Sequence, residues 1–322
     1  MKAAIASENG LVISDVPQPQ PKPTEVLVRV RAAGLNRADL SAARGAFHPG
    51  HGIAGQPIGL EWAGDVTAVG SETQEFKVGD KVMGSGIGGY AEYAVSDWGR
   101  TLPMPDGMSY EQAATLPVAL HTMHDALITN GRLKPGEAVL IQGASTGVGL
   151  MGLQIAKLKG ASIVIGSSTN AERRAKLKDF GADLAIDTRD ETWPDQVLKA
   201  TGGKGVNLIV DQISGSVANA NMQACALLAR IVNVGRLGGA KAEFNFDLHA
   251  LKRIDYIGVT FRTRTVEEVR EISQRMRADI WDAVTSGKLH LPIDRAFPLD
   301  EAPAAHAHMR ANAHFGKILL VM

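Results

Sequence analysis

Cysteine is nearly absent from this sequence, since Cys225 is the only one in the chain. A single cysteine excludes an intrachain disulfide and any cysteine-rich zinc site, and it is typical of a protein kept in a reducing compartment. We interpret Cys225 as a small buried hydrophobic residue.

An excess of charge of either sign is also lacking, because Lys plus Arg and Asp plus Glu each number 34. A balanced chain gives no electrostatic reason to bind nucleic acid or an anionic membrane. No stretch reaches the roughly 18 apolar residues of a membrane-spanning helix, and the N-terminus lacks the apolar core of a signal peptide. We therefore expect a cytoplasmic protein that binds neither nucleic acid nor membranes.

The 322 residues are enough for two domains, at about 150 residues per domain. Up to about Leu120 the pattern is one of short strands broken by Pro and Gly, which predicts a partly open β-barrel. Beyond Ser109, which can form a capping box with Gln112, strands alternate with helices. This change in the predicted secondary structure indicates a domain boundary.

Five apolar runs in the second region predict a parallel sheet covered on both faces. They are Ala138–Gln142, Ser162–Gly166, Val206–Asp211, Arg230–Gly235 and Tyr256–Phe261. Helices are expected between them, beginning near Val148 and over Ala171–Phe180 and Val217–Leu228. Thr265 and Glu268 predict another capping box at the start of a long helix, after which the tail returns to the first domain. The predicted domains are 1–120 with 265–322, and 121–264.

A glycine turn follows the first of these strands, in the segment Gln142-Gly-Ala-Ser-Thr-Gly-Val-Gly149. A strand, a turn and a helix start in this order direct free backbone N–H groups at a pyrophosphate. The segment departs from Gly-x-Gly-x-x-Gly, because Ala144 and Thr146 occupy the first two glycine positions. The alternative is a glycine turn that serves only strand–helix packing.

The second strand ends in Gly166-Ser-Ser-Thr-Asn170, where an NAD-preferring site has an acid for the ribose 2′-hydroxyl. Ser167 and Ser168 can donate to a 2′-phosphate instead, and Arg173 adds a guanidinium that can bind it. The pattern favours NADPH. In the alternative interpretation, Arg173 and Arg174 are only solvated charges of a helix's first turn.

The whole chain resembles the zinc-independent quinone oxidoreductases of the medium-chain dehydrogenase/reductase superfamily, most of all the p53-inducible quinone oxidoreductase subgroup. The resemblance rests on the joint order of several motifs: Ala32-Ala-Gly-Leu-Asn-Arg-Ala-Asp39, Gly59-Leu-Glu-Trp-Ala-Gly-Asp-Val66, Val78-Gly-Asp-Lys-Val82, Gly89-Tyr-Ala-Glu-Tyr93 and Gly316-Lys-Ile-Leu319. It implies an α/β protein with a GroES-like β-barrel catalytic domain and a doubly wound Rossmann domain. It also implies a homodimer.

Zinc-dependent relatives place a cysteine where this chain has Asn36 and a histidine where it has Leu60. With neither ligand present, no metal site is expected. His306 and His308 would not share a helix face, and His48 and His51 lie in a Gly/Pro loop, so another histidine site is not expected either. Quinones and activated alkenes suit such a site better than plain alcohols.

The resemblance implies roles for particular residues in an NADPH site between the domains. The expected cofactor contacts are Asn36, Arg37, Thr122, Gly147, Val148, Gly149, Ser167, Ser168, Arg173, Gly235, Arg236, Thr260 and Phe261. Phe47, Tyr90 and His124 are expected in the substrate pocket. No catalytic residue is singled out, and the candidates are Asn36, Asp39 and His124.

These residues have structural interpretations as well. Asn36 and Asp39 can simply cap a turn, Glu61 can be a buried structural acid, and His124 can be a structural histidine. Phe47 stands where many relatives have a tyrosine, and it cannot donate a proton.

The sequence leaves three functions open. The first is NADPH-dependent reduction of a quinone. The second is reduction of an enone or enoyl thioester, which would favour a proton donor near the nicotinamide ring. The third is an NADPH-binding protein with little turnover.

Overall fold

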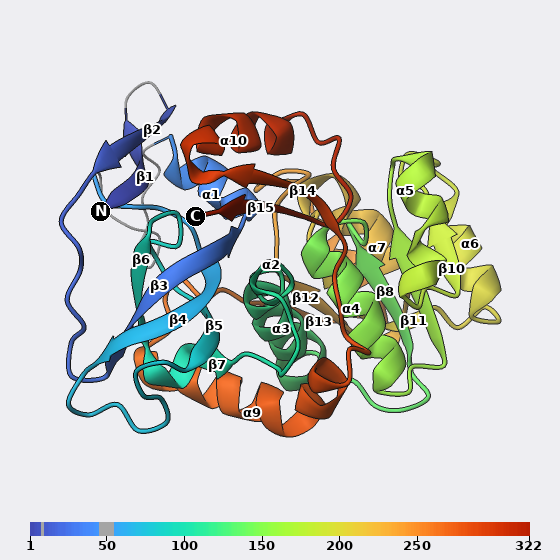
Figure 1. Ribbon diagram of the computed structural model, residues 1–322. Coiled ribbons are helices and arrows are strands. Elements are labelled where there is room, and N and C mark those ends of the chain that lie inside the picture. Colours follow the sequence, from blue (N-terminus) through green and yellow to red (C-terminus); the bar gives the residue numbers. More distant parts are fainter. Residues whose placement is uncertain (8–9, 45–54) are drawn as a thin grey trace. The chain divides into compact units, whose positions relative to one another are not determined.

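The computed structural model describes residues 1–7, 10–44 and 55–322 (Figure 1). The chain divides into two compact units, one made of Met1–Val118 and Phe261–Met322 and the other of Ala119–Thr260. Phe47, His48 and His51 lie outside the described residues, so the substrate-pocket role expected of Phe47 stays a prediction.

Strands dominate the first unit. They are β1 (Lys2–Ser7), β2 (Gly10–Asp15), β3 (Glu25–Gly34), β4 (Glu61–Val69), β5 (Lys81–Ser85), β6 (Tyr93–Asp97), β7 (Thr101–Pro103), β14 (Ile293–Pro298) and β15 (Lys317–Val321). β1 and β2 form an antiparallel pair, and the seven-stranded sheet has the order β14-β15-β3-β4-β5-β7 with β6 paired to β3. The C-terminal tail is part of this sheet, because β15 pairs with β3.

Two helices of the first unit, α2 (Tyr110–Ala113) and α9 (Val266–Thr285), begin at side-chain caps that the sequence predicts. The other helices of this unit are α1 (Arg37–Ala42) and α10 (Ala302–Arg310), with short 3-10 turns at Trp98–Arg100 and Leu299–Glu301. The predicted capping box of Thr265 and Glu268 is confirmed at the start of α9. The Ser109 hydroxyl accepts a hydrogen bond from the Gln112 amide and so starts α2. α3 (Pro117–His124) runs from this unit into the second.

The second unit contains the predicted parallel sheet. Its strands are β8 (Ala138–Gln142), β9 (Ile163–Ser167), β10 (Leu184–Ile186), β11 (Val206–Asp211), β12 (Cys225–Asn233) and β13 (Asp255–Gly258). The order is β10-β9-β8-β11-β12-β13, and all neighbours are parallel. Every residue of β8 is buried, as an apolar run in the middle of a covered sheet requires.

Helices fill the connections between these strands (Figure 1). They are α4 (Gly147–Leu158), α5 (Ala171–Ala175), α6 (Trp193–Ala200), α7 (Ala218–Ala224) and α8 (Phe246–Lys252), with a π-helix at Asp125–Asn130 and 3-10 turns at Leu177–Phe180 and Gly215–Val217. The predicted helix Ala171–Phe180 is therefore divided between α5 and a 3-10 turn. β10 was not predicted, because three residues carry too little pattern.

The predicted helix Val217–Leu228 is wrong beyond Ala224. Cys225 has extended backbone angles and begins β12, whose first residues pair in parallel with Val206 of β11. Leu228 has a φ of 61°, which no helix tolerates. Pairing with a neighbouring strand thus outweighs the local helical spacing. Cys225 itself is 1% exposed, which confirms it as a buried hydrophobic residue.

Candidate functional site

The turn between β3 and α1 carries the first group of predicted site residues. The backbone N–H of Asn36 donates to Oδ2 of Asp39 at 2.8 Å, and the N–H of Asp39 donates to the carbonyl of Asn36 at 3.0 Å. The first bond is the Asp39 half of a capping box at the start of α1, and the second closes the turn. The interpretation of Asn36 and Asp39 as capping residues is therefore confirmed.

Beneath this turn, the side chain of Asn36 joins a buried ion pair. Its Nδ2 donates to Oε1 of Glu61 at 2.9 Å, and the Lys317 ammonium donates to the same carboxylate oxygen. Oε2 of Glu61 accepts the N–H of Val118 at 2.8 Å. Glu61 is 0% exposed, which confirms it as a buried structural acid. Sequence reasoning missed Lys317, although a lone charge at the start of the apolar run Lys317–Met322 was a signal.

Asp39 also has a second partner on its other side. The Tyr90 hydroxyl donates to Oδ2 of Asp39 at 2.6 Å, and both side chains are buried. Burial raises the pKa of Asp39 to about 7, against the lowering effect of the bonds from Tyr90 and Asn36 and of the Lys317 charge. Burial likewise raises the pKa of Tyr90 well above its usual value. Asn36, Asp39 and Tyr90 thus lie in one buried cluster of the first unit, and their roles in the site stay predictions.

Asp39→Asn is expected to remove a pH dependence of stability. A carboxyl whose pKa is raised in the folded state binds its proton more tightly than in the unfolded chain, so wild-type stability falls as pH rises from about 4 to 7. An amide mimics the protonated acid. Relative to wild type, the free energy of unfolding of the variant should therefore rise by on the order of 2–4 kcal/mol between these pH values, measured by urea unfolding.

The exposed Asp106→Asn is the matched control, and its unfolding curve should follow that of wild type at each pH. If Asp39→Asn and wild type differ by the same free energy at pH 4.5 and at pH 8, Asp39 is not the group that titrates.

In the second unit, the glycine turn and the start of α4 pack closely together. Gly143 has a φ of 71°, and the Thr146 hydroxyl caps α4 by accepting from the N–H of Gly149 at 2.9 Å. A Cβ on Gly149 would lie 2.6 Å from the carbonyl oxygen of Gly143 and 2.7 Å from Cα of Ala144. Only glycine fits there. Gly147 and Val148 form the first turn of this 12-residue helix, whose N-terminus suits a pyrophosphate.

The two serines at the end of β9 differ in whether their hydroxyls can donate to a phosphate. Ser167 is 2% exposed, and its hydroxyl donates to Oε1 of Gln142 at 2.6 Å while accepting from the N–H of Gly143 at 2.9 Å. Its one hydroxyl hydrogen is therefore used internally, and the expected phosphate contact from Ser167 is not supported. Ser168 donates to the hydroxyl of Ser145 at 3.0 Å, beside the glycine turn.

The two arginines after β9 are also not equivalent. Arg174 donates to the Ser168 carbonyl at 2.8 Å and pairs with Asp187 at 3.0 Å, so it is not a solvated charge. A hydrogen bond from Arg189 is the main cause that lowers the pKa of Asp187 to about 2. Arg173 is half-buried in the first turn of α5 and stays the predicted phosphate contact.

A buried polar network supports the loops at the carboxyl ends of β8, β9 and β11. Asp211 accepts two backbone N–H groups of the loop that follows it and the side chain of Asn221 at 2.9 Å. Asn221 accepts from Gln142 at 2.7 Å, and Gln142 accepts from Ser167. Burial raises the pKa of Asp211. Sequence reasoning missed this network, because its members are far apart in the chain.

The remaining predicted residues are placed as follows. Arg37 donates to Asn312. Thr122 is half-buried and His124 is buried on α3. The Gly235 carbonyl accepts from the Ser214 hydroxyl at 2.6 Å, whereas Arg236 is exposed. Thr260 and Phe261 are half-buried and belong to different units.

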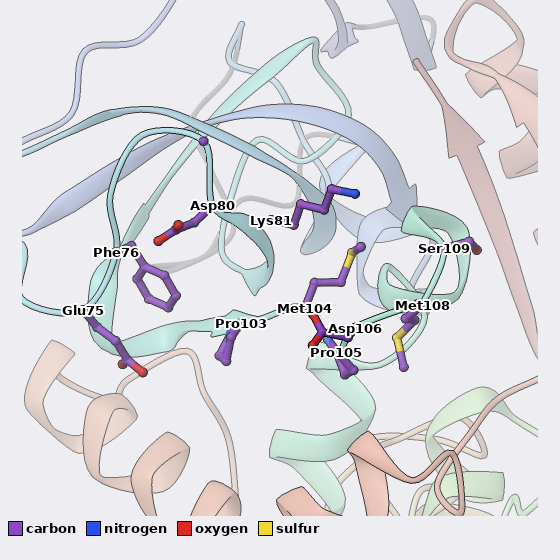
Figure 2. Close-up of a pocket in the computed structure, with 12 residues that line it drawn as sticks. Glu75, Phe76, Asp80, Lys81, Pro103, Met104, Pro105, Asp106, Met108 and Ser109 are labelled. Atoms are coloured by element: carbon purple, nitrogen blue, oxygen red, sulfur yellow. The ribbon is translucent and has the colours of Figure 1, made fainter.

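A pocket of about 670 Å³ opens in the first unit, away from these residues. Figure 2 shows Glu75 and Phe76 on one side of it and Met104 and Asp106 on the other. Its lining contains no predicted site residue. We therefore assign no role in the reaction to this pocket.

Two kinds of feature are absent from residues 1–7, 10–44 and 55–322. No helix there is both long and apolar enough to cross a membrane. No three His, Cys, Asp or Glu side chains in the same ranges are placed to hold a metal ion.

Known proteins match both units. The family described as Alcohol dehydrogenase GroES-like domain matches residues 22–106, and the family described as Zinc-binding dehydrogenase matches residues 147–278. Human quinone oxidoreductase is 30% identical over 312 residues, which cover 96% of this chain and 92% of that protein.

Two further relatives match along nearly the whole chain. A phenolphthiocerol/phthiocerol polyketide synthase protein of Mycobacterium tuberculosis is 31% identical over 97% of this chain, but the chain spans only 14% of that protein's length. The crystal structure of Pseudomonas syringae pv. tomato DC3000 quinone oxidoreductase has a TM-score of 0.88 at 29% identity, with 100% of this chain and 99% of that chain covered. The predicted GroES-like and Rossmann folds are confirmed. The chain therefore belongs to the medium-chain dehydrogenase/reductase superfamily and is an oxidoreductase similar to quinone oxidoreductases.

Proposed function

We propose that this oxidoreductase reduces quinones and related activated carbonyl compounds with NADPH, by direct hydride transfer and without zinc. The proposal rests on one observation: the hydrogen-bond donors around Asn36 are already used within the protein. The Asn36 amide, the Lys317 ammonium and the Tyr90 hydroxyl all donate to groups within the protein. None of these three is left to polarise a plain ketone, whereas a quinone accepts a hydride without such help.

The second unit fits the cofactor. Gly147, Val148 and Gly149 would hold the pyrophosphate, because the glycine turn allows it to approach the helix N-terminus closely. Ser168 and Arg173 would hold the 2′-phosphate at an end of β9 that carries no acid. We assign the nicotinamide half to Asn36, Arg37, Thr122, Gly235, Arg236, Thr260 and Phe261, with Tyr90 and His124 toward the substrate.

When bound, NADPH supplies a hydride, which converts a quinone into a hydroquinonate anion, and one proton then gives the hydroquinone. Water can provide that proton, since the oxygen of a reduced quinone is readily protonated at neutral pH. Asp39 and His124 are therefore not required as acids. Buried Asp39 instead accepts hydrogen bonds from Tyr90 and from the backbone of Asn36.

A substrate panel tests this function. We expect ortho- and para-quinones to be reduced with NADPH faster than simple ketones, and full activity in the presence of a chelator. If an enoyl thioester exceeds every quinone in kcat/KM by more than about tenfold, roughly 1.4 kcal/mol of barrier, enoyl reduction replaces quinone reduction as the proposed function. NADPH binding without turnover on the whole panel would favour the non-enzymatic alternative.

Membership of the p53-inducible subgroup and a cytoplasmic location stay predictions. The predicted homodimer has one structural support. β13 is an edge of the parallel sheet, and Phe246 and Leu251 on nearby α8 are 75% and 72% exposed. A second copy that pairs edge to edge would cover them. Sedimentation of a monomer at micromolar concentration would contradict this part of the proposal.

A further inference from the structure

The ammonium of Lys317 lies in a closed cage of oxygen atoms. The side chain is 4% exposed, and Nζ donates to the Leu35 carbonyl at 2.9 Å, to Oδ1 of Asn36 at 3.1 Å and to Oε1 of Glu61. An ammonium has three hydrogens, so these three bonds use all of them. Lys317 therefore has no donor left for a substrate.

The cage also fixes Asn36 completely. Its N–H donates to Asp39, its carbonyl accepts from the same residue, its Nδ2 donates to Glu61 and weakly to the Gly34 carbonyl, and its Oδ1 accepts from Lys317. Lys317 thus reaches from β15 to both the backbone and the side chain of the β3–α1 turn. Among the described residues, only Lys317 joins the amide oxygen of Asn36 to the Glu61 carboxylate.

We propose that Lys317 is a positioning residue of the oxidoreductase site. Its ammonium holds the β3–α1 turn in one conformation, so that Asn36 and Arg37 present a constant surface to the nicotinamide and the substrate. The inference rests on the proposed function, which puts these residues beside the nicotinamide. A displacement of about 1 Å in a positioning group can cost on the order of a hundredfold in rate.

The charge of Lys317 matters as much as its hydrogen bonds. Glu61 is 0% exposed, so loss of the ammonium leaves a buried carboxylate without its counter-charge. The same charge lowers the pKa of Asp39, whose other charged neighbour, Glu61, raises it. Removal of Lys317 therefore disturbs the whole cluster of Asn36, Asp39, Glu61 and Tyr90.

Lys317→Ala with chemical rescue tests the proposal. Propylammonium replaces the atoms that the substitution removes. For the variant we expect kcat with a quinone to fall by about thirtyfold or more, while the Kd of NADPH changes by less than about threefold because the phosphate contacts lie in the second unit. Propylammonium should restore kcat with saturation, whereas tetramethylammonium, which has no N–H, should not.

Arg270→Met is the matched control. Arg270 makes a bidentate ion pair with Asp97 in the same unit, outside the cluster, so the variant should lose stability with an unchanged kcat. If Lys317→Ala behaves in the same way, with a lower Tm but a wild-type kcat, Lys317 is merely structural and the proposal is overturned. A low kcat that propylammonium does not restore overturns it as well.

A double variant covers the case in which Lys317→Ala does not fold. Lys317→Met and Glu61→Gln should each lower the Tm by on the order of 10 °C, because each leaves one buried charge without its partner. The double change removes both buried charges, so its Tm should lie above that of the less stable single variant. We expect the double variant to fold with a low kcat, because the turn has lost its tether. A wild-type kcat in the double variant would overturn the proposal.

Failure of the proposed function can be told apart from failure of this inference. If wild type reduces no quinone, the substrate assignment is wrong, and the environment of bound nicotinamide still reports on the turn. The fluorescence of bound NADPH should then differ between wild type and Lys317→Ala and return with propylammonium. Identical fluorescence in both proteins would overturn the inference.

Discussion

Gly149→Ala is expected to weaken NADPH binding by roughly ten- to a hundredfold and to destabilise the second unit. By helix propensity alone, alanine would stabilise α4 by about 1 kcal/mol. The new Cβ, however, would lie 2.6–2.8 Å from backbone atoms of Gly143 and Ala144, which cannot rotate away. Overpacking of this kind costs about 1–3 kcal/mol, so the clash outweighs the propensity. The turn must shift, and the pyrophosphate contacts shift with it.

Gly152→Ala, one turn further along α4, is the matched control. Its Cβ would meet the Met123 sulfur at 2.9 Å and the Ile141 Cδ1 at 3.4 Å, both near the ends of flexible side chains. We expect a change in NADPH affinity of less than about threefold for this variant. Titration of both proteins with NADPH, together with thermal unfolding, measures the difference. Equal Kd values for Gly149→Ala and wild type would show that the pyrophosphate does not bind at this turn.

Arg173→Ala is expected to weaken NADPH by roughly ten- to a hundredfold and to leave NADH nearly unchanged. The end of β9 has no acid, and Arg173 lies in the first turn of the helix that follows, where its guanidinium can meet a 2′-phosphate. Ser167 and Arg174 are committed to Gln142 and Asp187. A charge-assisted hydrogen bond contributes on the order of 1.5–3 kcal/mol. Dissociation constants for both coenzymes measure the effect.

Ser168→Asp complements this variant. A carboxylate there would repel the 2′-phosphate and offer a ribose hydroxyl its usual acceptor, so the double change with Arg173→Ala should approach a preference for NADH. Arg189→Ala serves as the control, because Arg189 already pairs with Asp187. A wild type that prefers NADH, or an Arg173→Ala variant that loses both coenzymes equally, contradicts the assigned role.

The parallel sheet was predictable because its signals are local. Each of β8, β9 and β11 has a mostly apolar sequence that ends in a polar residue, and the capping box of α9 lies within four residues. The glycine turn and the absence of an acid after β9 are equally local. Of the missed elements, β10 is too short to carry a pattern, and the start of β12 has helical spacing that pairing with β11 overrides.

The sequence by itself determined the two-domain α/β organisation, the dinucleotide turn, and the absence of a cysteine and a histidine at Asn36 and Leu60. Only the tertiary structure decided which polar side chains remain available. It tied the Ser167 hydroxyl to Gln142, and it joined Asn36 to Glu61 and to Lys317, which is 281 residues away in the chain. A buried donor must find an acceptor wherever the fold supplies one, and no local pattern records that partner.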